Sequence, residues 1–319
     1  MPGEPLRYLS RADVEAVALE GTEVVVILER AFRAKREGDV EMPPKIGVHP
    51  RDDAFIHAMP AYVSDTDAVG LKWVAGYPSN QPLGIPYIHG LFVLSDAATG
   101  RPLAVMDATW ITELRTAAAS MLGIRALAEG PVEAIGIIGC GRQGHVHLEL
   151  AEQVFPTLRR ARLFDRHPER AAALAAAHPK LDAHLASAAE EIGPGAHVVV
   201  SSAAIVRHPE RPLRRAHLTD ATVACAVDFD ATLSEDLFED AASFVVDDVA
   251  QYRYYRQQGY FAGYPAEATE LAEVLRPDAP RPRGLNVYVP LGIALEDVAV
   301  AAEVNRRAAA ADLGRALPL

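Results

Sequence analysis

Cysteine is nearly missing from this sequence. The chain has 319 residues and two cysteines, Cys140 and Cys225, which lie far apart and form no C-x-x-C pair. This spacing argues against a zinc site and a disulfide framework, and it fits a reducing compartment. The sequence also has no run of about 18 apolar residues and no basic segment followed by an apolar one at its start. It therefore predicts a cytoplasmic protein that does not cross a membrane.

Positive charge is also scarce. The chain has 31 Lys and Arg against 43 Asp and Glu, which gives a net charge of −12. Such acidity disfavours binding to nucleic acid or to an anionic membrane, so neither is expected as a partner. His145 and His147 are two positions apart and cannot share a helix face, so we expect no metal site. The length favours about two domains.

What the sequence does contain is a glycine-rich turn in a distinctive setting. A β-prone run at 134–138 leads into Gly139-Cys140-Gly141-Arg142-Gln143-Gly144, and a helical pattern and a second short strand follow. Strand, G-x-G-x-x-G, helix and strand come in the order of a dinucleotide-binding unit.

Each glycine of this turn has a physical role. Gly139 permits a tight turn, Gly141 lets the backbone approach a pyrophosphate, and Gly144 lets helix and strand pack closely. The helix start, which includes Arg142 and Gln143, offers unpaired N–H groups to phosphate. A structural turn without a nucleotide is the alternative interpretation.

The acid at the end of the second strand bears on cofactor choice. Asp165 lies where a carboxylate accepts hydrogen bonds from an adenine ribose, which favours NAD. Arg166, directly after it, is suited to a 2′-phosphate, so NADP is not excluded. Ser201 closes a later strand and is expected to line the cofactor groove.

The rest of the chain predicts an α/β protein. Helices are expected at 11–18, from 21 or 22 to 37, at 112–129, at 169–177 and at 295–313, and strands at 69–75, 89–95, 102–106 and 197–201, with further strands within ATVACAVDFD and ASFVVDD. The β-α-β order after 132 implies a parallel sheet, whereas the first part is mixed α/β. The aromatic segment YRYYRQQGYFAGY (252–264) is interpreted as a surface helix or a dimer contact.

With this layout, the sequence resembles the ornithine cyclodeaminase and μ-crystallin family. The clearest matches are GLKWVAGYPSN, GLFVLSDAATGRPLAVMDATWITELRTAAASMLGIRALA and IGIIGCGRQGHVHL, in the family's order and spacing. Weaker similarity, including MPPKIGVHP and FIHAMPAY, extends the match over 40–305.

The resemblance implies a fold and a chemistry. A doubly wound Rossmann sheet at 116–294 is inserted into a mixed α/β domain at 1–115 plus 295–319, which binds substrate and forms a homodimer. The implied chemistry acts on an amino or imino acid with NAD(H) or NADP(H).

The resemblance also implies site residues in the first domain. Lys72 matches the family's substrate lysine, which holds a carboxylate or relays a proton; an edge-strand lysine that reaches solvent is the alternative. Arg115, expected in the first turn of its helix, matches a bidentate carboxylate clamp, and a salt bridge to Glu113 or Asp107 is the alternative. Lys45 stands where many members carry an arginine that shares this task, so the charge is kept and the fork geometry is lost.

A carboxylate is expected at the end of the strand AVDFD. Asp228 and Asp230 both qualify from the sequence, because ligands bind at the carboxyl edge of open parallel sheets. The family's spacing selects Asp230 as the acid near the substrate amine. The family's glycine-rich turn before this acid is replaced by Val227-Asp228-Phe229.

Two departures from the family affect the expected reaction. His57 stands where ornithine cyclodeaminases proper carry a glutamate, and it either acts as an acid or base near neutral pH or simply packs. Pro290 replaces a small hydroxyl residue. The leading hypothesis is therefore an NAD(P)-dependent oxidoreductase that interconverts an α-amino acid and its imine. The alternatives are an ornithine- or lysine-type cyclodeaminase and a non-catalytic, crystallin-like cofactor-binding protein.

Overall fold

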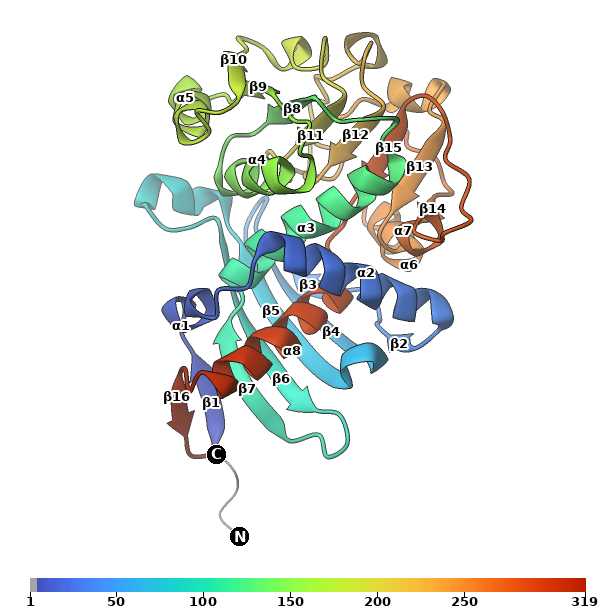
Figure 1. The fold of residues 1–319 in the computed structure, drawn as a ribbon. Helices are drawn as coiled ribbons and strands as arrows, with labels where there is room; N and C mark the ends of the chain where they lie inside the picture. The colour runs from blue at the N-terminus through green and yellow to red at the C-terminus, as the bar shows by residue number, and fades with distance from the viewer. Residues whose placement is uncertain (1–4) are drawn as a thin grey trace. The chain divides into compact units, whose positions relative to one another are not determined.

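The computed structural model describes residues 5–319, which divide into two compact units. The first unit contains the described residues up to Arg115 together with Gly292–Leu319, and the second contains Thr116–Leu291. This division lies three residues before the boundary expected at 295. Figure 1 traces the chain through its elements.

The first unit is built on a mixed eight-stranded sheet. Its strands have the order β16-β1-β7-β6-β5-β4-β2, and β3 pairs with β4. Adjacent strands are antiparallel except β1 and β7, which are parallel. The strands are β1 (Leu6–Leu9), β2 (Val40–Glu41), β3 (Ile46–Val48), β4 (Phe55–Val63), β5 (Ala68–Gly76), β6 (Ile88–Asp96), β7 (Pro102–Asp107) and β16 (Arg315–Leu317).

Helices cover one face of this sheet. They are α1 (Arg11–Ala16), α2 (Gly21–Glu37), the start of α3 (Thr109–Leu127) and α8 (Ala294–Ala310), with short 3₁₀ turns at Ser64–Thr66 and Pro78–Leu83. Helix α8 packs on α2 and lies against β4, β5 and β6 (Figure 1). Because side chains alternate along a strand, Lys72 and Val74 of β5 are buried on one face while Leu71 and Trp73 are exposed on the other.

The second unit has a fully parallel sheet, as the β-α-β order predicted. Its strand order is β10-β9-β8-β11-β12-β15-β13-β14. The strands are β8 (Ala134–Ile138), β9 (Arg160–Phe164), β10 (Asp182–Leu185), β11 (Val198–Ser201), β12 (Val223–Ala226), β13 (Ser243–Val246), β14 (Thr269–Glu270) and β15 (Asn286–Val289). Strand order reverses beside β8, where doubly wound sheets bind their ligands.

Four α-helices follow α3 in this unit, among the described residues. They are α4 (Arg142–Val154), α5 (Pro168–Ala177), α6 (Val249–Gln257) and α7 (Leu271–Val274), with 3₁₀ turns at Ala189–Glu191, Arg215–His217 and Glu235–Glu239. The link from β11 to β12 contains only a 3₁₀ turn, so this crossover is not the α-helix of an ideal β-α-β unit.

The aromatic segment at 252–264 was interpreted as a surface helix or a dimer contact, but four of its aromatic rings are buried. Tyr252 and Phe261 are fully buried, and Tyr255 and Tyr264 are nearly so. Their rings pack on one another and on Phe229 in the core of the second unit. The segment therefore contributes hydrophobic burial to the nucleotide-binding fold.

Candidate functional site

The glycine-rich turn joins β8 to α4 as the sequence predicted. Gly139 adopts φ +87°, and a Cβ there would lie 2.7 Å from the backbone of Ser202. A Cβ on Gly144 would lie 2.3 Å from the carbonyl oxygen of Gly139. Both glycines are therefore required by the protein's own backbone.

Gly141 has no such internal reason to be glycine. Its φ of −78° and ψ of −160° are open to any residue, and no protein atom lies within 4 Å of an added Cβ. Beside it, the buried Oε1 atom of Gln143 has no hydrogen-bond partner among the described residues. A bound group that lies against this backbone accounts for the glycine at 141, and the turn therefore fits a dinucleotide pyrophosphate.

The acid after β9 is tied to the same turn. Asp165 accepts hydrogen bonds from the backbone N–H of Cys140, at 2.8 Å, and of His167, at 2.9 Å. Burial raises the pKa of the Cys140 thiol to about 12, with a further contribution from Asp165. Arg166 is exposed and forms a 2.7 Å ion pair with Glu210, so its guanidinium is already engaged by a carboxylate.

Ser201 and Asp228 link the ends of β11 and β12. Ser201 is fully buried, and its hydroxyl donates to Asp228 Oδ1 at 2.7 Å. Asp228 Oδ2 accepts from Thr232 Oγ1 and from the backbone N–H of Ala203. Burial raises the pKa of Asp228 despite these bonds. The Ser201 hydroxyl is therefore used in joining two strand ends.

Asp230 lies in a turn and not on a strand. The strand was expected to reach Asp230, but β12 ends at Ala226, and 227–230 form a turn in which Phe229 has φ +62°. Asp230 is 3% exposed, and its Oδ2 atom accepts from Arg211 Nη2 at 2.5 Å and from the Phe261 N–H at 2.9 Å. Both donors use Oδ2, so within residues 5–319 no identified hydrogen bond goes to Oδ1.

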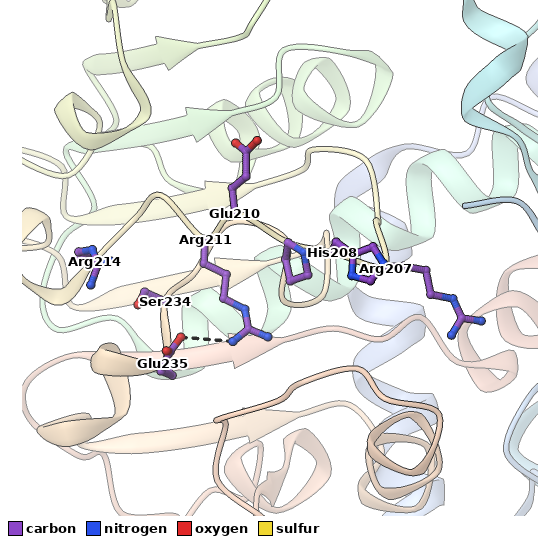
Figure 2. A pocket seen from close by; sticks show the side chains of 8 residues that line it. Arg207, His208, Glu210, Arg211, Arg214, Ser234 and Glu235 are labelled. Carbon is purple, nitrogen blue, oxygen red and sulfur yellow. Dashed lines mark hydrogen bonds and ion pairs between the residues drawn. The ribbon is translucent and has the colours of Figure 1, made fainter. Parts of the chain in front are cut away.

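Arg211 also lines an open pocket of about 440 Å³ in the second unit. Figure 2 shows its guanidinium directed toward Glu235, while Arg207 and Arg214 point to opposite sides. The arginines of this pocket therefore do not converge on one point.

Lys72 is buried at the centre of the first unit. It is 1% exposed on β5, which has strands on both sides, so the alternative of an edge lysine in solvent is wrong. Its Nζ donates to Asp297 Oδ1 at 2.7 Å and to Thr112 Oγ1 at 3.3 Å. Burial and the charge of Arg115 lower the pKa of Lys72 to about 8, although Asp297 and Glu296 oppose this shift.

Arg115 lies deeper in its helix than expected. Helix α3 begins at Thr109, so Arg115 is not in the first turn, and the argument from the helix dipole is wrong. Its Nη1 donates to Glu296 Oε2 at 2.7 Å, and its Nε donates to Asp297 Oδ1 at 3.0 Å. A Cβ on Gly292, which has φ +70°, would lie 2.6 Å from Arg115 Nη1, so a larger residue there would displace the guanidinium.

Lys45 and His57 lie near these groups. Lys45 is buried and donates to the carbonyl oxygen of Gly292 at 3.1 Å. His57 stacks on Phe55 with ring centroids 4.4 Å apart. Burial, followed by the charges of Lys45, His49 and Lys72, lowers the pKa of His57 to about 2. A pKa this low keeps the His57 ring neutral near pH 7, which favours the packing alternative.

Sequence reasoning missed Glu296 and Asp297, at the start of α8. Both are fully buried and complete a cluster with Lys72 and Arg115, called here the charge cluster. The available signal was two adjacent acids in the otherwise apolar stretch GIALEDVAV. Among the described residues, no group of three or more His, Cys, Asp or Glu is arranged to hold a metal ion. Within the same residues, no helix has the length and apolarity needed to cross a bilayer.

A parallel sheet with a glycine turn between its central strand and the next helix defines a Rossmann-type dinucleotide-binding protein. Residues 7–312 match the ornithine cyclodeaminase/mu-crystallin family, and the chain belongs to this family.

Relatives and solved structures of this family include redox enzymes. The nodulation efficiency protein NfeD of Rhizobium meliloti is 47% identical over 152 residues, which cover 48% of each chain, so this match spans about half the length of that relative. The Thermococcus litoralis Delta(1)-pyrroline-2-carboxylate reductase, solved with NADH and L-proline, is 26% identical with a TM-score of 0.86 over 98% of this chain and 100% of that one. An archaeal alanine dehydrogenase dimer with bound NAD is 28% identical with a TM-score of 0.85 over 97% and 98%.

The buried neutral His57 leads to a prediction about stability. In the unfolded chain its pKa is 6.5, whereas in the folded chain it is about 2. Between these values the unfolded state binds more protons, so stability is lost as the pH falls, by up to about 1.4 kcal/mol per pH unit. His57→Phe should remove this contribution. Urea unfolding at about pH 7.5 and about pH 5 should show that the variant loses about 2 kcal/mol less than the wild type.

The difference in free energy of unfolding between the two proteins above pH 6.5 serves as the control, because it measures the packing cost of the substitution alone. His147, whose pKa burial lowers to about 4, is present in both proteins and cancels in the difference. Equal losses of stability in the two proteins would contradict the lowered pKa of His57.

Proposed function

We propose that the protein is an NAD(H)-dependent oxidoreductase that interconverts an α-amino acid and its imine. In this proposal the second unit binds the dinucleotide at 139–144, and the charge cluster with Lys45 binds the substrate carboxylate. The observation that carries the proposal is the gathering of three buried cations in the first unit. Lys45, Lys72 and Arg115 are each at most 8% exposed, and burial raises the pKa of the neighbouring Glu296. A substrate carboxylate is an anion that such a group of cations would bind.

The reaction balances as the transfer of a hydride and a proton. Reduction adds a hydride at Cα of the imine and a proton at nitrogen, and oxidation of the amino acid is the reverse. The bound nicotinamide supplies the hydride chemistry. The residues of this chain bind and orient the substrate. Arg115 and Lys45 bind its carboxylate, and Lys72 is the third cation beside it. Asp230, with Oδ1 left by Arg211 and Phe261, would accept a hydrogen bond or a proton from the substrate nitrogen.

NAD is proposed over NADP from the surroundings of the expected ribose site. Asp165 directs a carboxylate to this region, and Arg166 is paired with Glu210. A 2′-phosphate would therefore meet a carboxylate and an arginine whose charge is already balanced. The relatives solved with NADH and with NAD support the same choice.

A homodimer is proposed from the uncovered face of the first unit's sheet. Leu71 is 37%, Trp73 51% and Leu91 49% exposed, and Trp73 and Leu91 are register partners on β5 and β6. Exposed apolar side chains gathered on one face are typical of an interaction surface. The dimeric archaeal relative supports a second copy of this chain as the partner.

The first test is turnover. Purified protein should oxidise NADH in the presence of cyclic or acyclic α-imino acids, or reduce NAD in the presence of amino acids. Ammonia released from ornithine or lysine without accumulation of NADH would instead identify a cyclodeaminase. Cofactor binding without turnover on the whole panel would leave a crystallin-like binding protein and overturn the proposal.

Substrate binding is tested at Lys45, whose Nζ donates to the backbone carbonyl oxygen of Gly292. Lys45→Met should raise KM for the carboxylate substrate by about tenfold, since about 1.4 kcal/mol of binding is lost, with little change in kcat. Lys180→Met, at an exposed lysine, is the control and should behave as wild type. An unchanged KM in Lys45→Met would remove Lys45 from the site.

Cofactor binding is tested at Gly141, with Gly144 as the matched glycine. Gly141→Ala adds a methyl group in open space, so the free energy of unfolding should change by less than about 0.5 kcal/mol. Its Kd for NADH, from a fluorescence titration, should rise at least about tenfold because the methyl group meets the pyrophosphate. Gly144→Ala should instead destabilise the fold by about 2 kcal/mol through the contact with Gly139. Wild-type affinity in Gly141→Ala would contradict the assignment of the loop.

The dimer is tested with a pair of equally exposed leucines. Leu91, at 49% exposure, lies on the uncovered sheet face of the first unit, and Leu185, at 48%, lies on β10 of the second. Leu91→Glu should yield a monomer in light scattering, because a carboxylate buried at an interface without a partner costs several kcal/mol. Leu185→Glu should leave the dimer intact. Equal behaviour of the two variants would mean that this face is not the interface.

A further inference from the structure

The start of α8 brings two acids into the buried interior of the first unit. Asp297 Oδ1 accepts from Lys72 Nζ at 2.7 Å and from Arg115 Nε at 3.0 Å, and Glu296 Oε2 accepts from Arg115 Nη1 at 2.7 Å. Both carboxylates are 0% exposed. The charges and orientations of the cluster's side chains are therefore set by contacts among residues of β5, α3 and α8 and not by solvent.

Each acid also leaves one oxygen unused. Glu296 Oε1 and Asp297 Oδ2 are buried without a hydrogen-bond partner among the described residues. Buried polar atoms are almost always paired, and burying a carboxylate costs several kcal/mol before its partner compensates. Well-packed apolar residues would serve stability at least as well at such positions. A role in setting the charge and the orientation of Lys72 and Arg115 explains why acids occupy these positions.

The two adjacent acids share Arg115 but differ at Lys72. Among the described residues, Asp297 is the only carboxylate hydrogen-bonded to Lys72, whose other bond goes to the neutral Thr112 hydroxyl. Glu296 bonds to Arg115 and makes no hydrogen bond to Lys72. A change at Asp297 therefore acts on the lysine as well as on the arginine, whereas a change at Glu296 acts mainly on the arginine.

We propose that Asp297 is a positioning residue that keeps the Lys72 ammonium charged and directed at the substrate, and that Glu296 positions the Arg115 guanidinium. This inference rests on the proposed function of the same cluster. Neither acid is assigned a contact with substrate; each acts through the cation that it holds.

The pH dependence follows from the groups that face Lys72. They are Asp297 and Glu296 on α8, Arg115 and Thr112 on α3, and His57 on β4, and the charges of Lys45 and His49 also act on His57. Burial and Arg115 lower the pKa of Lys72 to about 8, and the two acids hold it up. Losing the Asp297 charge should lower the pKa further, by about one to three units. If activity needs the ammonium, its alkaline limb lies near pH 8 in the wild type and moves to lower pH in Asp297→Asn.

The experiment compares pH profiles of kcat/KM for wild type, Asp297→Asn and Glu296→Gln on a substrate that the wild type reduces. Asp297→Asn should move the alkaline limb down by about one to three units. Glu296→Gln should move it less and should raise KM by about tenfold through the loosened Arg115. If both variants lose activity equally with an unmoved limb, the acids are merely structural and the proposal is overturned.

Asp297→Glu separates orientation from charge and also serves if Asp297→Asn does not fold. It keeps the carboxylate but displaces it by one methylene, so the limb should stay near pH 8 while kcat falls about tenfold. A wild-type kcat in this variant would overturn the orientation role, and a limb that moves as far as in Asp297→Asn would overturn the charge role.

A measurement without turnover separates this inference from the proposed function. The chain has only four lysines, Lys35, Lys45, Lys72 and Lys180, so selectively ¹⁵N- and ¹³C-labelled lysine gives few NMR signals, and Lys72→Arg assigns one of them. In wild type the Lys72 signal should titrate near pH 8, and in Asp297→Asn at lower pH. A moved titration without turnover on any substrate would reject the proposed function alone. An unmoved titration in an active enzyme would reject the role of Asp297 alone.

Discussion

The first unit depends on one interaction, the buried pairing of Lys72 and Arg115 with Asp297 and Glu296. Any one of these charges, buried alone, would cost several kcal/mol, so all four must be brought together for the unit to fold. The cations lie on β5 and α3, in the first 115 residues, whereas the acids lie on α8, near the C-terminus. This explains why residues after Gly292 fold with the N-terminal sheet, although the second unit separates them in sequence.

The charge cluster depends on side-chain contacts, whereas the glycine turn of the second unit depends on the absence of side chains. Gly139 and Gly144 are fixed by contacts with the protein's own backbone, whereas Gly141 borders open space. The first two preserve the strand–turn–helix geometry, and the third keeps a surface of backbone accessible. Such an accessible backbone surface accommodates a bound dinucleotide. Family membership and the relatives solved with NADH and NAD agree with this role of Gly141.

Local features of this protein were predictable from the sequence, and long-range pairings were not. The parallel sheet, the glycine turn and Asp165 follow from strand and helix periodicity within a short segment. The partners of Arg115 lie 181 and 182 residues away, and no local pattern contains them. The aromatic segment at 252–264 was misjudged for a related reason: its arginines suggested a surface, but Arg256 donates to backbone carbonyls inside the unit while the rings pack in the core.

The turn before Asp230 illustrates how such long-range contacts replace a local rule. Relatives are expected to use glycine here, yet this chain holds Phe229 at φ +62°, and the two residues that bond Asp230, Arg211 and Phe261, also have positive φ, at 51° and 60°. Each such residue costs of order 1 kcal/mol or more. Phe229 packs on Phe261 with centroids 5.5 Å apart, and Arg211 lies over Tyr264, so aromatic burial offsets the strain. The position of Asp230 is therefore set by the aromatic core of the second unit and not by the flexibility of its own turn.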